Sequence, residues 1–216
     1  MSQFTLIMGN KNYSSWSLRA WLVLKHLLVP FEEVVIPLYR DESRNTLLHY
    51  SPSVKVPVLK HGEYTVWDSL AICEYLSDIF PDHYLWPADS HARAYARSIS
   101  AEMHSGFQNL RQNMPMNCCL SRPGYGRTPD VDRDIERIIG IWTECRKQFG
   151  ARGAFLFGSF GIADAMYAPV VTRFITYGVT LNGLAQDCLN TIMNLPSIKE
   201  WYEAAQKEPY SIPAFD

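Results

Sequence analysis

The sequence predicts an α/β domain with a mixed sheet at residues 1–81, a linker at 82–90 and an all-helical domain at 91–216. Short strand-like and helical patterns alternate through the first of these segments. The linker is rich in Pro and Asp, and beyond it the strand signals stop while helical spacing of apolar residues continues. The predicted order is strand, helix, strand, short helix, strand, strand, helix. Strands mixed with helices in this order indicate one four-stranded sheet with helices on its faces.

The elements of the first domain follow from apolar runs and from the residues that end them. The run that begins at Phe4 ends at Gly9, and the run that begins at Phe31 ends at Pro37. Apolar residues at helical spacing indicate the helices, and Pro81 stops the third one. We therefore expect strands at 4–8, 31–36, 56–59 and 64–67, and helices at 15–28, 41–50 and 69–80.

The second domain is predicted to consist of helices alone. Apolar residues keep helical spacing over one long segment, 92–114, and a loop rich in Pro, Gly and Cys follows. Thr128 and Pro129 form a cap and first-turn pair, which opens the next helix. Further helices are expected at 162–177, 184–194 and 196–207.

Composition excludes several classes of protein. The chain has 216 residues and a formal net charge of -2, so no strong field attracts nucleic acid or anionic lipid. Its five cysteines include no CxxC pair, and the adjacent Cys118 and Cys119 lack the spacing of a zinc site. We interpret them as reduced thiols in a cytoplasmic compartment. We expect neither a signal peptide nor a membrane span.

The first place where chemistry is expected is the strand-to-helix turn that contains Ser14 and Ser15. Hydroxyl groups there lie beside the free amides and the positive dipole end of a helix, where an anion is stabilised. The alternative is that one of these serines is an ordinary helix cap, and from the turn alone that alternative is favoured.

Two further places lie at the ends of predicted elements. Val56 precedes Pro57 at a strand entrance, where proline is tolerated. Asp68 and Ser69 precede a helix, where the Ser hydroxyl and amide suit a carboxylate and the Asp suits an ammonium group. An ordinary helix cap is again the alternative.

Together these signals match a known pattern. Ser-Pro-Ser-Val-Lys-Val-Pro-Val-Leu at 51–59 and Trp-Asp-Ser-Leu-Ala-Ile-Cys-Glu-Tyr-Leu at 67–76 closely resemble the glutathione-site core of glutathione transferases. The family pattern is roughly NPxGKVPVL, then an acidic residue and Ser before LAIxEYL. The helical second half extends the resemblance to nearly the whole chain, and residues 157–165 look like the family's N-capping segment.

The resemblance implies a thioredoxin-like first domain and a glutathione-binding role for several residues. Lys55 would contact the glycine carboxylate of glutathione. The Val56 backbone would pair with the cysteinyl unit, and Pro57 would follow a cis bond. Asp68 and Ser69 would hold the γ-glutamyl ammonium and carboxylate.

The resemblance also implies that the serine turn faces the sulfur, as in serine-type classes such as zeta. In an ungapped alignment, Asn12 and Tyr13 stand where the zeta motif has its two serines, and Ser14 stands where it has cysteine. We take Ser14 as the first candidate for the thiolate partner and Ser15 as the next. Tyr13 is the alternative.

Other positions depart from the family pattern or have a structural role in it. Val54 replaces a glycine before the lysine, and Gly161 replaces a capping serine. Asp164 would be buried and structural. The electrophile pocket would lie between the opening turn and the helix around Arg111 to Met114.

The expected function is therefore that of a glutathione transferase, with glutathione as co-substrate, no metal and a small-molecule electrophile. The alternatives are a glutathione-dependent isomerase, a peroxidase, and a non-catalytic binding protein of the same fold. We expect a homodimer, because the family pairs the first domain of one subunit with the second domain of its partner. We expect no nucleic-acid or membrane partner.

Overall fold

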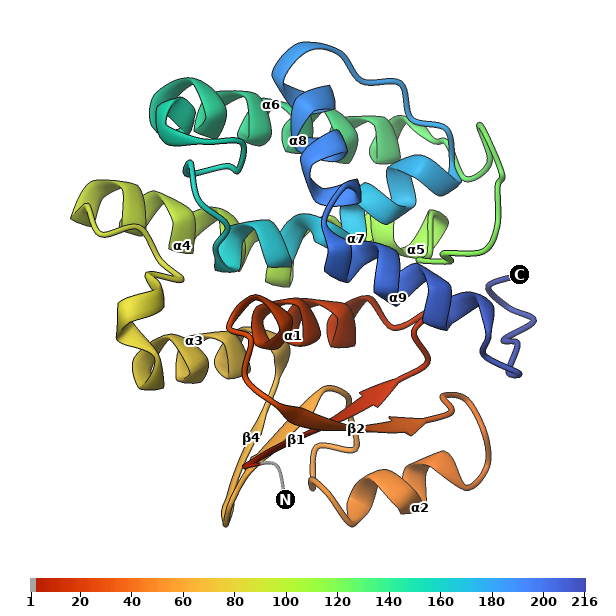
Figure 1. Cartoon of the computed structure of the whole chain (residues 1–216). Helices are drawn as coiled ribbons and strands as arrows, with labels where there is room; N and C mark the ends of the chain where they lie inside the picture. The colour runs from red at the N-terminus through yellow and green to blue at the C-terminus, as the bar shows by residue number, and fades with distance from the viewer. Residues whose placement is uncertain (1–2) are drawn as a thin grey trace.

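The computed structural model describes residues 3–216, and its first part is a four-stranded mixed sheet with helices on both faces (Figure 1). The strand order is β2-β1-β3-β4; β1 and β2 are parallel, and the other two pairings are antiparallel. The predicted fold class is confirmed. The elements are β1 (Phe4–Gly9), α1 (Ser15–His26), β2 (Phe31–Ile36), α2 (Ser43–Leu48), β3 (Val58–His61), β4 (Tyr64–Trp67) and α3 (Ser69–Ile79).

The sheet is buried on both faces because successive residues of a strand point in opposite directions. On β1, Leu6 and Met8 join the main core that includes α1 and α3, whereas Ile7 packs with Leu47 of α2. Helices α1 and α3 lie on one side of the sheet and α2 on the other (Figure 1).

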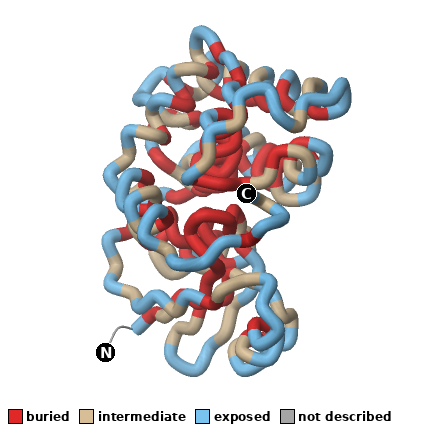
Figure 2. Tube along the Cα trace, turned by 90° about the vertical axis from the view of Figure 1, so that its right-hand side faces the viewer, coloured by how far each residue is buried: buried red, intermediate tan, exposed pale blue. Residues whose placement is uncertain are grey.

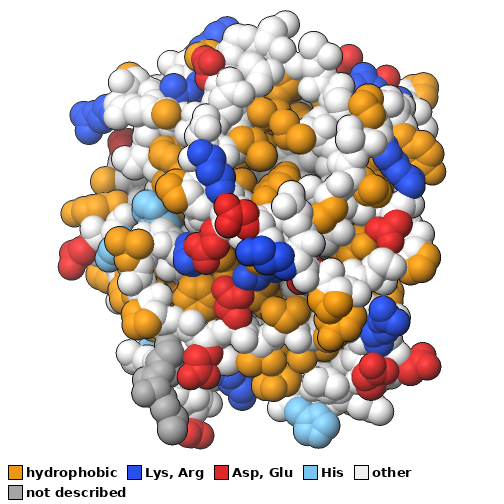
Figure 3. All heavy atoms as spheres, turned by 45° about the vertical axis from the view of Figure 1, so that its right-hand side comes forward, with side chains coloured by type: hydrophobic (Ala, Val, Ile, Leu, Met, Phe, Trp, Pro, Cys, Tyr) orange, Lys and Arg blue, Asp and Glu red, His pale blue; other side chains and the backbone are white. Residues whose placement is uncertain are grey.

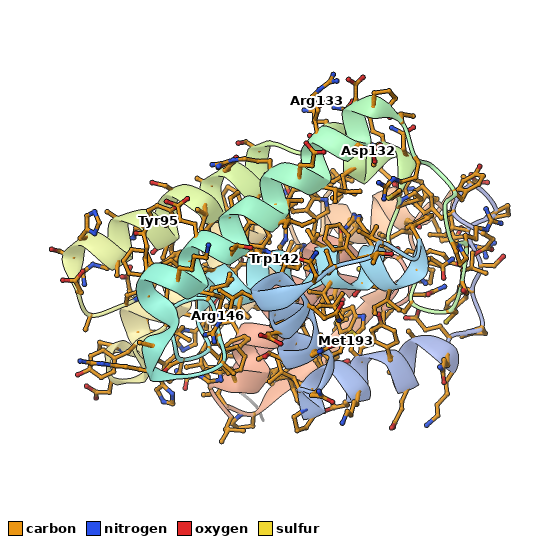
Figure 4. All side chains as sticks on the ribbon, turned by 90° about the horizontal axis from the view of Figure 1, so that it is seen from above. Tyr95, Asp132, Arg133, Trp142, Arg146 and Met193 are labelled. Carbon is orange, nitrogen blue, oxygen red and sulfur yellow. The ribbon has the colours of Figure 1, made fainter. Side chains whose placement is uncertain are left out.

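The rest of the described chain is helical, apart from two isolated bridges at 155–159. Helix α7 is buried along almost its whole length and contacts α1, α4 and α8 (Figure 2). Trp142 of α6 points inward and meets the ring of Phe174 at 5.6 Å between centroids (Figure 4). The elements are η1 (Pro81–His83), α4 (Ser90–Ser105), α5 (Gln108–Asn113), α6 (Pro129–Phe149), η2 (Gly150–Arg152), α7 (Ile162–Thr176), α8 (Gly183–Met193) and α9 (Pro196–Gln206).

Two predicted elements are wrong in detail. The expected helix over 92–114 is broken, because Phe107 has a left-handed backbone (φ 55°) between α4 and α5. Apolar spacing continues across the break, so the periodicity does not reveal it. The third strand begins at Val58, not at Val56, since the ladder pairs Val58 with Ile7 and proline has no N–H to donate.

The surface shows no segregation of charge on the face in Figure 3, where acidic and basic side chains intermingle around apolar ones. Within residues 3–216, none of the helices is both long enough and apolar enough to cross a membrane.

The start of α7 is fixed by a buried carboxylate. Asp164 is 3% exposed, and its two oxygens accept hydrogen bonds from the Leu156 and Gly161 amides at 3.0 and 2.9 Å. A Cβ on Gly161 would lie 2.7 Å from the Leu85 carbonyl oxygen, which accepts the Ile162 amide. Glycine stands in place of the capping serine because the chain at Leu85 passes too close for a side chain. The predicted structural role of Asp164 is confirmed.

Replacing Asp164 with Ala should lower the free energy of unfolding by about 3 kcal/mol, because two backbone amides lose their buried partner. Asp89→Ala is the matched control: this exposed cap of α4 accepts one amide, that of Ala92, and its loss should cost about 1 kcal/mol. Urea denaturation measures both values. Equal losses would contradict the buried-cap account.

The loss of stability in Asp164→Ala should also depend on pH. Burial raises the pKa of Asp164 from 3.8 to about 7, so the folded state favours the protonated acid. A raised folded-state pKa gives stability that is complete below pH 3.8 and is lost as the pH rises through about 7. The difference between wild type and Asp164→Ala should therefore be larger at about pH 5 than at about pH 8.

Candidate active site

A cavity of about 1270 Å³ lies between the sheet part and the helical part of the chain. It is lined by the β1–α1 turn, the segment after β2, residues 53–56 and the start of α3, and from the helical part by α4, α5 and α7. The predicted residues that line it are Ser14, Ser15, Lys55, Val56, Asp68 and Ser69. Pro57 is buried beside it and follows a cis peptide bond from Val56.

Asparagine side chains hold the β1–α1 turn from two sides. Asn10 Oδ1 accepts the Leu38 amide at 2.8 Å, and Asn12 Oδ1 accepts the amides of Cys118 and Cys119 at 2.8 and 3.2 Å. The turn is thereby tied both to the loop after β2 and to the segment between α5 and α6.

The end of the helical part also holds this turn. Glu208 accepts the backbone amides of Lys11 and Asn12 at 2.6 and 3.1 Å, and Trp201 Nε1 donates to the Lys11 carbonyl at 2.8 Å. Burial raises the pKa of Glu208. None of these contacts is visible in the sequence, because the partners are separated by about 190 residues.

The two serines of the turn differ in their hydrogen bonds. Ser14 caps α1: its Oγ donates to Ser17 Oγ at 2.7 Å and accepts the Ser17 amide at 3.4 Å. Ser17 Oγ in turn accepts the Gly9 amide at 3.0 Å. The Ser15 side chain makes no hydrogen bond to any residue within 3–216. Ser15 therefore presents the uncommitted hydroxyl of this turn.

Tyr13, the alternative sulfur partner, has its hydroxyl engaged elsewhere. That hydroxyl donates to Asp216 Oδ1 at 2.7 Å and accepts the Ile212 amide at 3.2 Å. Burial and the hydrogen bond to Asp216 raise the pKa of Tyr13. A tyrosine with a raised pKa that donates to a carboxylate is a poor candidate for stabilising a second anion.

Asp68 has two separate roles in the structure. Oδ1 caps α3 by accepting the amides of Leu70 and Ala71 at 2.9 and 3.2 Å. Oδ2 lies 3.2 Å from His104 Nε2 of α4. The residue itself has a left-handed backbone (φ 77°), which is uncommon for a side chain other than glycine.

Ser69 is the least satisfied polar group at the cavity. It is 1% exposed, and its hydroxyl has no hydrogen-bond partner among the described residues. A buried hydroxyl without a partner costs roughly 1–3 kcal/mol. Because Ser69 lines the cavity, its hydroxyl is available to form a hydrogen bond with a molecule that enters it.

The segment 53–56 lines the cavity. Val54 has φ 54°, the left-handed conformation that favours glycine, at the position where valine replaces the family's glycine. The backbone N–H and C=O of Val56 form no hydrogen bond within residues 3–216. Lys55 is exposed, and its ammonium group pairs with no carboxylate in that range.

Three arginines lie at or behind the cavity wall: Arg111, whose helix the sequence analysis placed at the electrophile pocket, Arg173, which also lines the cavity, and the buried Arg19. The guanidinium groups of Arg19 and Arg111 lie 4.3 and 5.3 Å from the Trp16 ring centroid. Arg19 is fully buried, and its Nε and Nη1 have no hydrogen-bond partner among the described residues. Burial, and next the nearby positive charge of Arg173, lower the pKa of Arg19 to about 9. Burial, and next the positive charge of Arg111, lower the pKa of Arg173 to about 10. Only tertiary structure brings these cations together.

No metal site accompanies the cavity: among residues 3–216, no three His, Cys, Asp or Glu side chains are grouped to hold an ion.

Comparison with known proteins gives the family. The family model described as glutathione S-transferase, N-terminal domain, matches residues 13–79, and the C-terminal domain model matches residues 128–204. The chain is 38% identical over 96 residues to a probable maleylacetoacetate isomerase of Caenorhabditis elegans, a match that spans 44% of each protein. It is 30% identical over 173 residues to a zeta-class glutathione S-transferase of Euphorbia esula, covering 76% of this chain and 73% of that one.

A solved structure supports the same fold. A glutathione transferase homolog from Burkholderia, with bound glutathione, superposes with a TM-score of 0.71 at 22% identity, covering 95% of this chain and 99% of that one. The two family models and the zeta-class relative point to the same family, and the structural likeness agrees with its fold. The chain belongs to the glutathione S-transferase family.

Proposed function

We propose that this protein is a glutathione transferase, which binds glutathione in the cavity, holds its thiol as a thiolate and directs it at a small electrophile. The observation that carries the proposal is the buried, unpartnered hydroxyl of Ser69. It lies beside the Asp68 carboxylate and lines the same cavity as the serine turn at the start of α1. Ligand groups of opposite charge are thus accommodated at one helix N-terminus, with a second helix N-terminus close to the sulfur.

The binding roles follow from the groups that line the cavity. Asp68 Oδ2, which also lies 3.2 Å from His104 Nε2, accepts the γ-glutamyl ammonium, and the Ser69 hydroxyl donates to the adjacent carboxylate. The free N–H and C=O of Val56 pair with the cysteinyl backbone as one strand pairs with another. The exposed Lys55 ammonium neutralises the glycine carboxylate, and Pro57 fixes the backbone that leads into β3.

The chemical step depends on ionising the thiol. A free cysteine thiol has a pKa near ~8.5, and each unit by which the pKa falls corresponds to about 1.4 kcal/mol. A serine hydroxyl and the N-terminus of α1 favour the charged sulfur. The thiol proton leaves to solvent, and the thiolate forms a carbon–sulfur bond to the electrophile held beside it. In a substitution the leaving group departs with the electron pair of its bond; in a conjugate addition the π pair of the double bond moves away from the attacked carbon and takes a proton from solvent.

The rival reading is a non-catalytic binding protein of the same fold. Such a protein has no need of an intact glutathione site, whereas here Asp68, Ser69 and Lys55 remain chemically suitable. Retention on immobilised glutathione, followed by conjugation assays, tests the proposal. A chain that neither binds glutathione nor conjugates it would overturn it.

A second candidate activity is glutathione-dependent isomerisation. Arg111 and Arg173 line the cavity and favour an electrophile that carries a carboxylate, and one relative is named as a maleylacetoacetate isomerase. A panel of neutral electrophiles, peroxides and cis-enone acids separates transferase, peroxidase and isomerase activity. Preference for the acids would favour the isomerase.

The compartment and the assembly are also part of the proposal. The five cysteines form no disulfide, which supports a reducing, cytoplasmic compartment. We expect a homodimer, so light scattering should give about twice the 24.7 kDa of one chain. A single-chain mass at micromolar concentration would contradict this.

Ser69→Ala should weaken glutathione binding by about ten- to hundred-fold, since a hydrogen bond to a charged group contributes about 1.5–3 kcal/mol. Ser100→Ala is the matched control, because Ser100 also has a buried hydroxyl without a partner but does not line the cavity. Calorimetry measures both affinities. Unchanged binding in Ser69→Ala, or equal losses in both variants, would remove Ser69 from the site.

Ser15→Ala should raise the pKa of the bound thiol by about one unit or more while altering glutathione affinity little, because only the thiolate needs the hydroxyl. Ser14→Ala should instead lower stability by about 1 kcal/mol through loss of the α1 cap. Measuring the absorbance of the bound thiolate against pH, together with thermal melts, distinguishes the two variants. The reverse pattern would assign the sulfur contact to Ser14, and no pKa change in either variant would reject the serine-type mechanism.

A further inference from the structure

The chain after α9 returns to the cavity. From Glu208 onward it runs along the β1–α1 turn, and its end lies between the sheet part and the helical part (Figure 2). Ile212 is buried there, whereas its neighbours in sequence are exposed. The segment 208–216 is thus packed against the site and not merely adjacent to it.

Tyr13 anchors this segment to the turn. Its hydroxyl donates to Asp216 Oδ1 at 2.7 Å and accepts the Ile212 amide at 3.2 Å. From the helical part, Asn117 Nδ2 donates to the Phe215 carbonyl at 3.0 Å and to Asp216 Oδ1 at 3.3 Å. These hydrogen bonds fix the backbone at Phe215, because they bind both its carbonyl oxygen and the side chain of the next residue, Asp216.

The anchored Phe215 side chain forms part of the cavity wall. Its ring lies 6.1 Å from that of Tyr13 and meets the ring of Tyr39 edge-on at 5.4 Å. Both partners also line the cavity, so the three rings form one aromatic wall next to Ser14. Aromatic rings favour edge-to-face and offset contacts, and Phe215 is only partly buried at the cavity wall, so its ring can make such a contact with an apolar or aromatic group in the cavity.

We propose that Phe215 is a specificity-determining residue that selects aromatic or other flat apolar electrophiles, and that Tyr13 and Asp216 are the residues that position it. This rests on the proposed glutathione transferase function, because the electrophile is presented to the glutathione sulfur. The hydroxyl of Tyr13 thereby serves the architecture of the electrophile wall and not the sulfur itself.

Binding of two glutathione adducts tests the assignment without any need for turnover. S-dinitrophenylglutathione carries an aromatic group on the sulfur, and S-methylglutathione carries a small one. In Phe215→Ala, calorimetry should show an affinity about ten-fold lower for the aromatic adduct, with the S-methyl adduct within about two-fold of wild type. Tyr125→Ala is the control, since it removes an exposed ring that does not line the cavity.

Tyr13→Phe tests the positioning role. It removes both hydrogen bonds to the segment 208–216 while keeping the ring, so it should reproduce part of the loss for the aromatic adduct only. The pH titration of bound glutathione's thiol should stay unchanged. A raised thiol pKa in Tyr13→Phe would show that the hydroxyl serves the sulfur and would overturn the positioning role.

The other outcomes separate the two proposals. If wild type binds both adducts, and Phe215→Ala loses both equally or neither, the specificity assignment is wrong and the transferase proposal stands. If wild type binds neither adduct nor glutathione, the proposed function fails and the inference fails with it. Far-ultraviolet dichroism and thermal melts check that each variant is folded.

Discussion

The buried ammonium group of Lys11 is the constraint on which the geometry of the site depends. Its Nζ lies 2.6 Å from Glu33 and 5.2 and 5.5 Å from the ring centroids of Trp21 and Trp201. Burying a cation is costly unless it is paired and hydrogen-bonded, so the Lys11 ammonium needs strand β2, helix α1 and helix α9 in place around it. Because Lys11 lies in the turn that carries the serines, the same requirement fixes where their hydroxyls lie.

Local sequence predicted the elements whose signals are local. The cap at Thr128 and the strands and helices of the first domain depend on residues within a few positions of each other, or on alternation along a strand. The structural role of Asp164 was expected from the family resemblance and not from local spacing. The break at Phe107 could not be predicted, since apolar spacing continues through it and the left-handed residue is a phenylalanine. Local preference there is overridden by packing.

The residues of the candidate site also fall into two groups, those that the sequence can indicate and those that only the fold brings to the cavity. Asp68 and Ser69 could be proposed from the sequence because the motif around them is specific, although an acidic residue and a serine at a helix start are also ordinary caps. His104, Arg173 and Phe215 could not, because each comes from a different part of the helical half and shares no motif with the residues that it meets. The proposal of Ser15 in place of the first candidate Ser14 rests on Ser17, whose hydroxyl accepts a hydrogen bond from Ser14. That detail is side-chain geometry and is absent from a sequence pattern.

The contacts between the β1–α1 turn and the residues beyond 200 also set an order of assembly. The turn at 10–15 leaves the ribosome well before Trp201 and Glu208, which hold its backbone and are synthesised about 190 residues later. Pairings of such high sequence separation form late, because the intervening chain must first be ordered. The sheet domain therefore emerges before the contacts from α9 and Glu208 can hold this turn. A ribosome-bound chain that stops short of α9 would have most of the residues proposed to bind glutathione, but its serine turn would lack the contacts from Trp201 and Glu208.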